Sequence, residues 1–533
     1  MRPFPLSVGA SLRTERTAYA GPVTSARRVL IAIAGGLTLF LAFPDVGWWI
    51  AAPVAIAMFY VAILNATARG AFGYGWLLGM AFFLPHLWWA FVAVGPVPWI
   101  ALSALESVAI GLVGAVFAHV RRSELLSRAR WLEPVVFAVL WVALELLRSG
   151  WPFGGFPWGR VAFSAVDSPF GRLAWLGGAP LVSFAVVLVG AMVGAAVVAL
   201  RERRILAATA AAFASVAAFV APIGVPLDGR AETGTLSVAW VQGNLANEGL
   251  DSFERAREVT QNHRDASLDL AAREPNTQID LVIWPESASD IDPRFDAETA
   301  ADITLAAQAL DAPILLGTND YTPENGRYNL SLVWLPDGTQ LAGAEYRKQV
   351  PAAFAEYIPI RSIARLFSKE VDRVSTDVLP GKDPARIEVP ITSLGRAVTL
   401  GPIICFEVAY DWVPRQAARE GAEFLAIQTN NATFGVTPES TQQLEMSRLR
   451  AIETGRATLQ VSTVGVSAVI SPTGRIVDRA ELFTRAGGIA EIPLRTSLTP
   501  ATHWGGPIEV AFEALGAAIA GLVIAMRVRR RRR

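Results

Sequence analysis

The chain of 533 residues contains one cysteine, Cys405, at the end of the apolar run in "LGPIICFEVAYDW". The thiolate is the reactive form of cysteine, and a free thiol has a pKa of about 8.5, so a nucleophilic cysteine needs partners. Glu286 in "LVIWPES" could accept the proton, because burial raises the basicity of a carboxylate. Lys348 in "EYRKQVP" could stabilise both the thiolate and the oxyanion of a tetrahedral intermediate. Together the three residues predict covalent catalysis.

Each of these residues also has a purely structural interpretation. Cys405 could be core filler, Glu286 could begin a helix, and Lys348 could be a solvated turn lysine. Histidine, the usual base for cysteine, offers no good candidate. The four histidines lie in apolar spans, in a polar helix or at the return to the membrane: His86, His119, His263 and His503. No metal-ligand spacing such as HExxH occurs, so we expect neither a metal nor another cofactor.

The three residues fall within a region of ordinary globular composition, residues 232–500. Short β-rich runs alternate there with longer helical stretches, which is typical of a layered α/β domain. The predicted strands are 236–242, 279–284, 313–317, 329–335, 397–404, 423–428 and 459–470. The predicted helices are 252–273, 296–310, 411–420 and 438–455, and "LPDG" and "SPTGR" predict hairpin turns. Strand ends are where such sheets bind ligands, so we expect folding to bring the three distant residues together.

The chain as a whole is too apolar for an ordinary soluble protein, with 52% hydrophobic residues and a mean hydropathy of +0.38, and residues 29–225 are nearly all apolar and small. Formal net charge is zero, so no global field indicates nucleic acid. A membrane span needs about 20 apolar residues. Eight stretches qualify: 29–45, 47–66, 72–94, 98–119, 132–148, 175–200, 204–223 and 507–526. The first of these could instead be an uncleaved signal sequence.

The basic residues between the spans predict the orientation. Arginines gather in the N-terminal segment and in the second, fourth and sixth connections, whereas the first and third connections have none. By the positive-inside rule, residues 1–28 are cytoplasmic, and seven crossings place 232–500 outside the cytoplasm. After the eighth span the chain ends in a basic tail, residues 527–533, which agrees with a cytoplasmic C-terminus. The other interpretation of this tail is a nucleic-acid patch.

Two features of the apolar half need a further explanation. The connection near 148–174 contains "RSGWPFGGFPWGR", whose Trp, Phe and Pro suit a segment lying in the headgroup region. Glu106 and Glu145 fall inside apolar spans, where a carboxylate is costly. Such a residue is either functional or one half of a structural pair, and the sequence assigns neither one a role.

Four segments, in this order, resemble the nitrilase superfamily: "WPESA", "YRKQVPAAFAEYIP", "GPIICFE" and "TNNATFG". With the membrane spans, "GFPWGR" and "VQGN", the chain from about residue 29 to 527 resembles the apolipoprotein N-acyltransferase family. The resemblance implies eight transmembrane helices plus an exported α-β-β-α sandwich. It also implies that Glu286 is the general base, Lys348 the cationic stabiliser and Cys405 the nucleophile.

The same resemblance implies supporting roles for the neighbours of these three residues. Glu356 matches a second acid of the family's site, and Phe406 and Glu407 match the neighbourhood that orients the thioester. The chain departs from the pattern at Asn431 and Thr433, where the superfamily often has Asp and Trp. The segment after "VQGN" also lacks a tryptophan of the family's substrate arm.

The family implies a two-step acyl transfer in the bacterial inner membrane, with the catalytic domain on the periplasmic side. Cys405 takes an acyl chain from a phospholipid, and the α-amine of a diacylglyceryl-cysteine at the N-terminus of an apolipoprotein then accepts it. Spans at both ends of a catalytic domain suit two lipid-anchored substrates. The alternatives are a membrane-tethered nitrilase-type amidase and a transporter or scaffold without enzyme activity.

Overall fold

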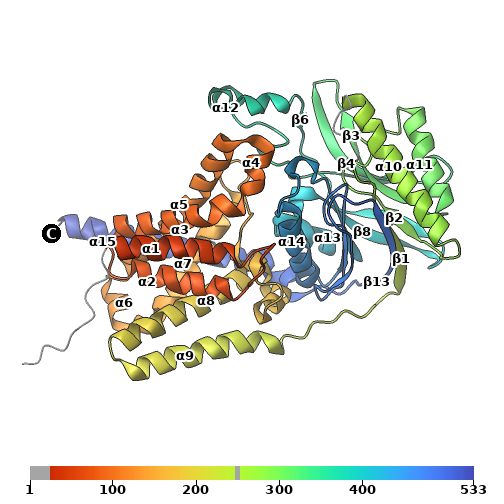
Figure 1. Ribbon diagram of the computed structural model, residues 1–533. Helices are drawn as coiled ribbons and strands as arrows, with labels where there is room; N and C mark the ends of the chain where they lie inside the picture. Colours follow the sequence, from red (N-terminus) through yellow and green to blue (C-terminus); the bar gives the residue numbers. More distant parts are fainter. Residues whose placement is uncertain (1–24, 246–251, 533) are drawn as a thin grey trace, which may run out of the picture.

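The computed structural model describes residues 25–245 and 252–532, which form a helical bundle and a two-sheet α/β domain (Figure 1). The bundle precedes the α/β domain in sequence, except for one long C-terminal helix that returns to it. Most of the predicted cytoplasmic N-terminal segment, residues 1–24, and the last residue of the basic tail, Arg533, lie outside the described residues, as does the segment 246–251 after "VQGN".

Helices cover all eight of the apolar stretches predicted as spans. The bundle consists of α1 (Ser25–Phe40), α2 (Ala51–Ile63), α3 (Ala68–His86), α4 (Trp88–Val94), α5 (Pro96–Val120), α6 (Glu124–Arg128), α7 (Glu133–Gly150), α8 (Ala174–Arg201), α9 (Ile205–Val220) and α15 (Pro500–Arg532). Within the described residues, four helices are long and apolar enough to cross a membrane, or five if the α3–α4 pair, bent by 59°, is one span. By length and composition, four or five helices therefore qualify as membrane spans, fewer than the eight spans that the sequence predicts.

Glycines allow the helices of the bundle to approach one another closely. A Cβ atom added at Gly36 of α1 would lie 2.3 Å from the Leu78 carbonyl oxygen of α3. One at Gly75 of α3 would lie 2.5 Å from the Ile110 carbonyl oxygen of α5. Small residues at such contacts are the usual means of packing helices in lipid, where no hydrophobic force drives them together.

The α/β domain contains two stacked β-sheets. The first has the order β13-β1-β2-β3-β4-β5, with β6 beside β4, and the second has the order β12-β11-β10-β9-β8-β7. The first sheet comprises β1 (Thr235–Gln242), β2 (Leu281–Ile283), β3 (Ile314–Tyr321), β4 (Gly326–Trp334), β5 (Gln340–Arg347), β6 (Asp377–Val378) and β13 (Ala486–Pro493). The second comprises β7 (Ile387–Ile391), β8 (Arg396–Ile404), β9 (Phe424–Thr429), β10 (Ala457–Ser462), β11 (Ala468–Ile470) and β12 (Ile476–Arg479).

Helices cover the outer face of each sheet, so the domain has the α-β-β-α sandwich architecture that the sequence resemblance implies. Figure 1 shows α10 (Ser252–Arg273) and α11 (Ala297–Ala309) on the far side from the bundle, and α13 (Trp412–Arg419) and α14 (Glu439–Thr454) beside it. Alternation along β1 explains the layers: Val238 and Trp240 face the core between the sheets, whereas Ala239 and Val241 face the core under α10 and α11.

One predicted strand is wrong in its extent. The stretch 459–470 forms two antiparallel strands, β10 and β11, instead of one. The chain turns tightly at Gly465, where a Cβ atom would lie 2.2 Å from the Asn431 side-chain oxygen. The turns predicted at "LPDG" and "SPTGR" do join antiparallel strands, β4 with β5 and β11 with β12.

Candidate active site

The three residues predicted to carry the chemistry all follow strand ends. Glu286 lies just after β2, Lys348 directly after β5, and Cys405 directly after β8. The first two belong to one sheet and the third to the other, so stacking of the sheets brings them together. A close approach fixes the Glu286 backbone, because a Cβ atom at Gly317 of β3 would lie 2.7 Å from its Cα.

Lys348 is buried between two acids. Its Nζ lies 3.5 Å from Oε1 of Glu286 and 2.9 Å from the carboxylate of Glu356, and only 1% of its side chain is exposed. Burial alone would lower the pKa of Lys348, but the carboxylates of Glu356 and Glu286 outweigh burial and raise it. The lysine is therefore a permanent ammonium ion at this site.

Glu286 is a buried carboxylate with donors on both oxygens. Its Oε1 accepts a hydrogen bond from Asn329 Nδ2 at 2.7 Å, and its Oε2 accepts one from the backbone N–H of Asn430 at 2.9 Å. Burial raises the pKa of Glu286, whereas Lys348 opposes this effect. The carboxylate is therefore a stronger base than an exposed glutamate, as a general base requires.

Cys405 has a left-handed backbone, with φ of 53°, at the start of a 3₁₀ turn from Cys405 to Ala409. Such a conformation costs an L-residue roughly 1–3 kcal/mol and is common where a side chain must be presented to a substrate. Burial raises the pKa of the Cys405 thiol well above its usual value, Glu286 adds to the rise, and Lys348 opposes it. The resting sulfur is a thiol, so it ionises only when a neighbouring base takes its proton.

Glu407 joins the nucleophile turn to the lysine segment. Its carboxylate accepts hydrogen bonds from the backbone N–H of Gln349 at 2.6 Å and of Ile404 at 2.8 Å, and from the Tyr346 hydroxyl at 2.9 Å. Burial raises the pKa of Glu407 to about 7, while Lys348 and the donors act in the opposite direction. Glu407 therefore fixes the distance between Cys405 and Lys348.

Phe406 connects the nucleophile turn to the helical bundle. Its ring stacks on Trp158, with centroids 6.0 Å apart, and on Phe156 at 5.8 Å. Both belong to the aromatic connection near 148–174, which the sequence predicts to lie in the headgroup region. Trp158 is almost fully buried, whereas Trp151 is 66% exposed, so this connection packs on the catalytic domain at one end and is open at the other.

An ion pair fastens the same connection to the α/β domain. Arg160 Nη1 lies 2.6 Å from Oδ2 of Asp411, and Arg450 Nη1 of α14 lies 2.7 Å from the other oxygen. Burial would raise the pKa of Asp411, but the two arginines outweigh it and hold the pKa well below its usual range. Arg450 also donates to the carbonyl oxygens of Val408 and Ala409 at 2.8 Å, which ties the junction to the nucleophile turn.

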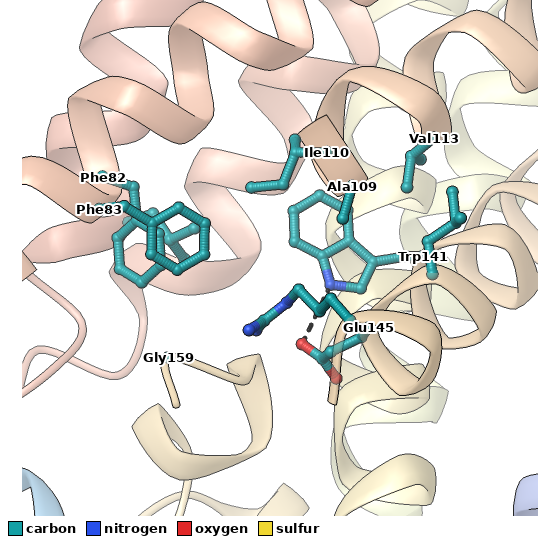
Figure 2. Close-up of a pocket in the computed structure, with 11 residues that line it drawn as sticks. Phe82, Phe83, Ala109, Ile110, Val113, Trp141, Glu145 and Gly159 are labelled. Carbon is teal, nitrogen blue, oxygen red and sulfur yellow. Dashed lines mark hydrogen bonds between the residues drawn. The ribbon is translucent and has the colours of Figure 1, made fainter. Parts of the chain in front are cut away.

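The two acids within apolar spans are paired. Glu106 lies 2.9 Å from Arg148 Nη1. Glu145 accepts hydrogen bonds from the backbone N–H of Val161 at 2.9 Å and from Trp141 Nε1 at 3.4 Å. Figure 2 shows the bond between Trp141 and Glu145 at the edge of a small pocket of the bundle. These contacts favour the structural interpretation of both acids.

Sequence reasoning missed two side chains of the site. Asn329 lies within β4 and donates to Glu286, and Gln443 lies on α14 and donates to Cys405 Sγ at 3.7 Å. No local motif marks either residue. A signal does exist in α14, whose sequence "ESTQQLEMSRLRAIET" is polar although most of the helix is buried, but burial becomes visible only in the structure.

Comparisons with known proteins agree with this division of the chain. Residues 237–498 match the family model for carbon-nitrogen hydrolases, so the site lies in a nitrilase-like enzyme domain. Residues 35–192 match the model for the apolipoprotein N-acyltransferase N-terminal domain. The chain belongs to the apolipoprotein N-acyltransferase family, and it is an acyltransferase.

Two relatives show how far the similarity extends. The chain is 38% identical over 517 residues to the apolipoprotein N-acyltransferase of Mycolicibacterium smegmatis, covering 92% of this chain and 84% of the relative. It is 30% identical over 496 residues to that of Azotobacter vinelandii, covering 89% and 91%. Among solved structures, the chain is similar to a mutant of a Nesterenkonia amidase from the nitrilase superfamily. The two are 18% identical with a TM-score of 0.36, and the match covers 49% of this chain and 92% of the amidase chain.

Proposed function

We propose that this chain transfers an acyl chain from a membrane phospholipid to the α-amine of the diacylglyceryl-cysteine that begins an apolipoprotein. The names of its relatives support the acceptor. The observation that carries the proposal is the place of Cys405: it lies beside a buried base and a buried ammonium, and the next residue stacks on a connection of the membrane helices.

In the first step, Glu286 accepts the Cys405 proton while the sulfur attacks the ester carbonyl of the phospholipid. Lys348 lies beside the sulfur and offsets the negative charge that develops on the carbonyl oxygen. The tetrahedral intermediate collapses to a thioester, and Glu286 returns its proton to the departing alkoxide, which leaves as lysophospholipid. Burial of Glu286 favours uptake of the Cys405 proton, because the protonated form of the acid is neutral, whereas Lys348 favours the carboxylate that forms when the proton is returned.

In the second step, the α-amine of the acceptor attacks the thioester carbonyl, and Glu286 takes a proton from the attacking nitrogen. Collapse of the intermediate forms the amide and releases the Cys405 sulfur as a thiolate, which regains its proton from Glu286. A covalent intermediate lets two bulky lipids use one site in turn. Glu356 holds Lys348 through both steps, and Glu407 holds the turn that carries the nucleophile and Phe406.

We further propose eight crossings of a bacterial inner membrane, with residues 1–28 and 527–533 in the cytoplasm and residues 232–500 in the periplasm. The arginines at alternate connections support this orientation. Helices also tether the α/β domain at both ends, since α9 ends at Val220 before β1 and α15 begins at Pro500 after β13. The tethers hold the active site near the lipid surface, where both substrates reside.

Mass spectrometry of the purified chain after exposure to phospholipid alone tests the first step. We expect the peptide that carries Cys405 to gain the mass of one fatty acyl chain, and a diacylated lipopeptide added next to remove that mass and become triacylated. Cys405→Ala is the control that must not gain it. Release of ammonia from small amides without triacylation would instead establish the amidase.

Thiol labelling in whole cells tests the orientation. In a Cys405→Ala background, single cysteines replace two exposed residues, Glu420 of the α/β domain and Arg201 at the end of α8. A membrane-impermeant maleimide that crosses the outer membrane should label Glu420→Cys in intact cells and Arg201→Cys only after lysis. The reverse pattern would contradict the proposed topology.

A further inference from the structure

Gln443 contacts the sulfur that performs the reaction. It lies on α14, is completely buried, and donates from Nε2 to Cys405 Sγ at 3.7 Å. None of the steps above uses this contact. Burying an amide side chain costs free energy unless both its NH₂ group and its oxygen are hydrogen-bonded, so the partners of Gln443 need an explanation.

The orientation of the Gln443 amide is fixed by Asn431. The Gln443 oxygen accepts a hydrogen bond from Asn431 Nδ2 at 3.0 Å, and the same nitrogen donates to Glu439 Oε2 at 2.7 Å. With its oxygen held in this way, Gln443 turns its NH₂ group towards Cys405. The orientation of Asn431 therefore decides whether the sulfur meets a donor or an acceptor.

Hydroxyl groups fix Asn431 in turn. Its Oδ1 accepts from Ser462 Oγ at 2.6 Å and from Thr429 Oγ1 at 3.0 Å. Ser462 Oγ itself accepts from the backbone N–H of Gly465 at 2.8 Å, so its own hydrogen is directed at Asn431. Apart from the branch to Glu439, the hydrogen bonds from Ser462 through Asn431 and Gln443 all run towards the sulfur, and each bond polarises the next.

We propose that Gln443 is a further catalytic residue that stabilises the thiolate of Cys405, and that Asn431 is a positioning residue that holds the Gln443 amide. This inference rests on the proposed role of Cys405 as nucleophile. It also gives a function to Asn431, one of the two positions at which the chain departs from the superfamily pattern.

The charges around the sulfur explain why a neutral donor is useful there. One ammonium and three acids act on Cys405: Lys348, Glu286, Glu356 and Glu439. A buried thiolate surrounded by acids is unfavourable, and a second ammonium would lower the pKa of Glu286 further and weaken it as a base. An amide hydrogen stabilises the thiolate without adding charge.

The pH dependence of Cys405 alkylation in the purified full-length chain tests the proposal. Cys405 is the only cysteine, so iodoacetamide reports on its thiolate alone. Gln443→Met keeps the size of the side chain and removes the donor. We expect the pH midpoint of alkylation to rise by about one unit, with alkylation below the midpoint slowed about 10-fold. Acylation by phospholipid should slow by a similar factor with KM unchanged.

Gln442→Met is the matched control. Gln442 is a buried amide on the same helix, but it accepts from Trp158 Nε1 at 2.7 Å and does not contact the sulfur. We expect its alkylation midpoint to equal that of the unaltered chain. An unshifted midpoint in Gln443→Met, or an equal shift in both variants, would overturn the proposal, because a structural role alone would not move this midpoint selectively.

Two further variants keep the test decisive. If Gln443→Met fails to fold, Gln443→Asn replaces it, because this variant retains an amide that is too short to reach the sulfur. Its pH midpoint of alkylation should also rise, and an unshifted midpoint would overturn the proposal. Asn431→Ala should give a smaller upward shift. Alkylation needs no acyl donor, so failure of the unaltered chain to form an acyl-enzyme would refute the proposed function and leave this measurement interpretable.

Discussion

Buried charges are arranged differently in the helical bundle and in the active site. In the bundle, Glu106 faces Arg148 and Glu133 faces Arg121, each at 2.9 Å. In the active site, Lys348 is shared between Glu286 and Glu356. One-to-one pairs leave no group free to exchange a proton, whereas a surplus of acid leaves a carboxylate that can still act as a base. Pairing therefore serves structure in one region, and incomplete neutralisation serves chemistry in the other.

Removing the nucleophile should have the largest effect. We expect Cys405→Ala and Cys405→Ser to lower acyl transfer by about 10⁴-fold or more, because no thioester can form in the first and the serine hydroxyl is a poor nucleophile here. The chain should still insert into the membrane, since the Cys405 side chain pairs with none of the bundle's charges. Transfer to a lipopeptide is the measurement. Activity within about tenfold of the unaltered chain would remove Cys405 from the mechanism.

Removing the shared cation should have the next largest effect. Lys348→Met leaves the buried Glu286 and the partly buried Glu356 without the cation between them, so we expect acylation of Cys405 to slow by about 10²–10³-fold. It also deletes the charge that opposes the rise in the Glu286 pKa, so the acid limb of the pH profile should move to higher pH. Single-turnover acylation across pH measures both effects. An unchanged rate would show that the ammonium is structural.

Breaking a pair in the bundle should affect stability and leave catalysis intact. Arg121→Met leaves the buried Glu133 carboxylate with only the Tyr60 hydroxyl at 3.1 Å among its described partners. We expect a loss of about 1–3 kcal/mol in unfolding free energy and a kcat within about twofold of the unaltered chain. Denaturation in detergent, with activity measured on the folded fraction, checks this. A large fall in kcat would erase the proposed distinction between the two regions.

Substitution of Glu439 should have the smallest effect at neutral pH. Glu439 is a buried acid that stays protonated there, in contrast to Glu286, the proposed general base. Burial raises the pKa of Glu439 to about 8, Asn431 opposes this by donating to it, and Glu286 adds to it. The folded chain then holds this proton at pH 7, and Glu439→Gln should change kcat/KM by about twofold or less. Above pH 8 the carboxylate ionises beside Cys405, so the unaltered chain should lose activity that the variant retains.

The same residue gives a stability test with a defined sign. Because the folded pKa of Glu439 lies above its ordinary value of 4.5, the folded state binds more protons than the unfolded state between these values. Its contribution to stability is complete below pH 4.5 and is lost as pH rises through about 8. Glu439→Gln should lack this decline, and parallel stability curves for the two chains would show that Glu439 is ionised at neutral pH.

The sequence predicted the central strands of each sheet and all four major helices of the α/β domain, because their hydrophobic periodicity is clear. It gave no residue range for β5, β6, β7, β12 and β13, although the two predicted hairpin turns imply the strands that follow them, β5 and β12. Several of these strands are short or partly exposed. In β12, exposed residues alternate with half-buried ones, so the hydrophobic pattern of the strand is weak when it is read without its neighbours. The eight apolar stretches were found for the same reason as the central strands, while the bend between α3 and α4 was not.

The residue types by themselves determined that a thiol, a carboxylate and an ammonium stand at strand ends, since a single cysteine and three lysines leave few choices. Only the tertiary structure decided the partners that make them work. Asn329, Gln443 and Glu439 reach the site from β4 and α14 because two sheets stack and a polar helix is buried against them. Hydrogen bonds depend on positions within a fraction of an ångström, and chain segments distant in sequence reach such positions only through packing.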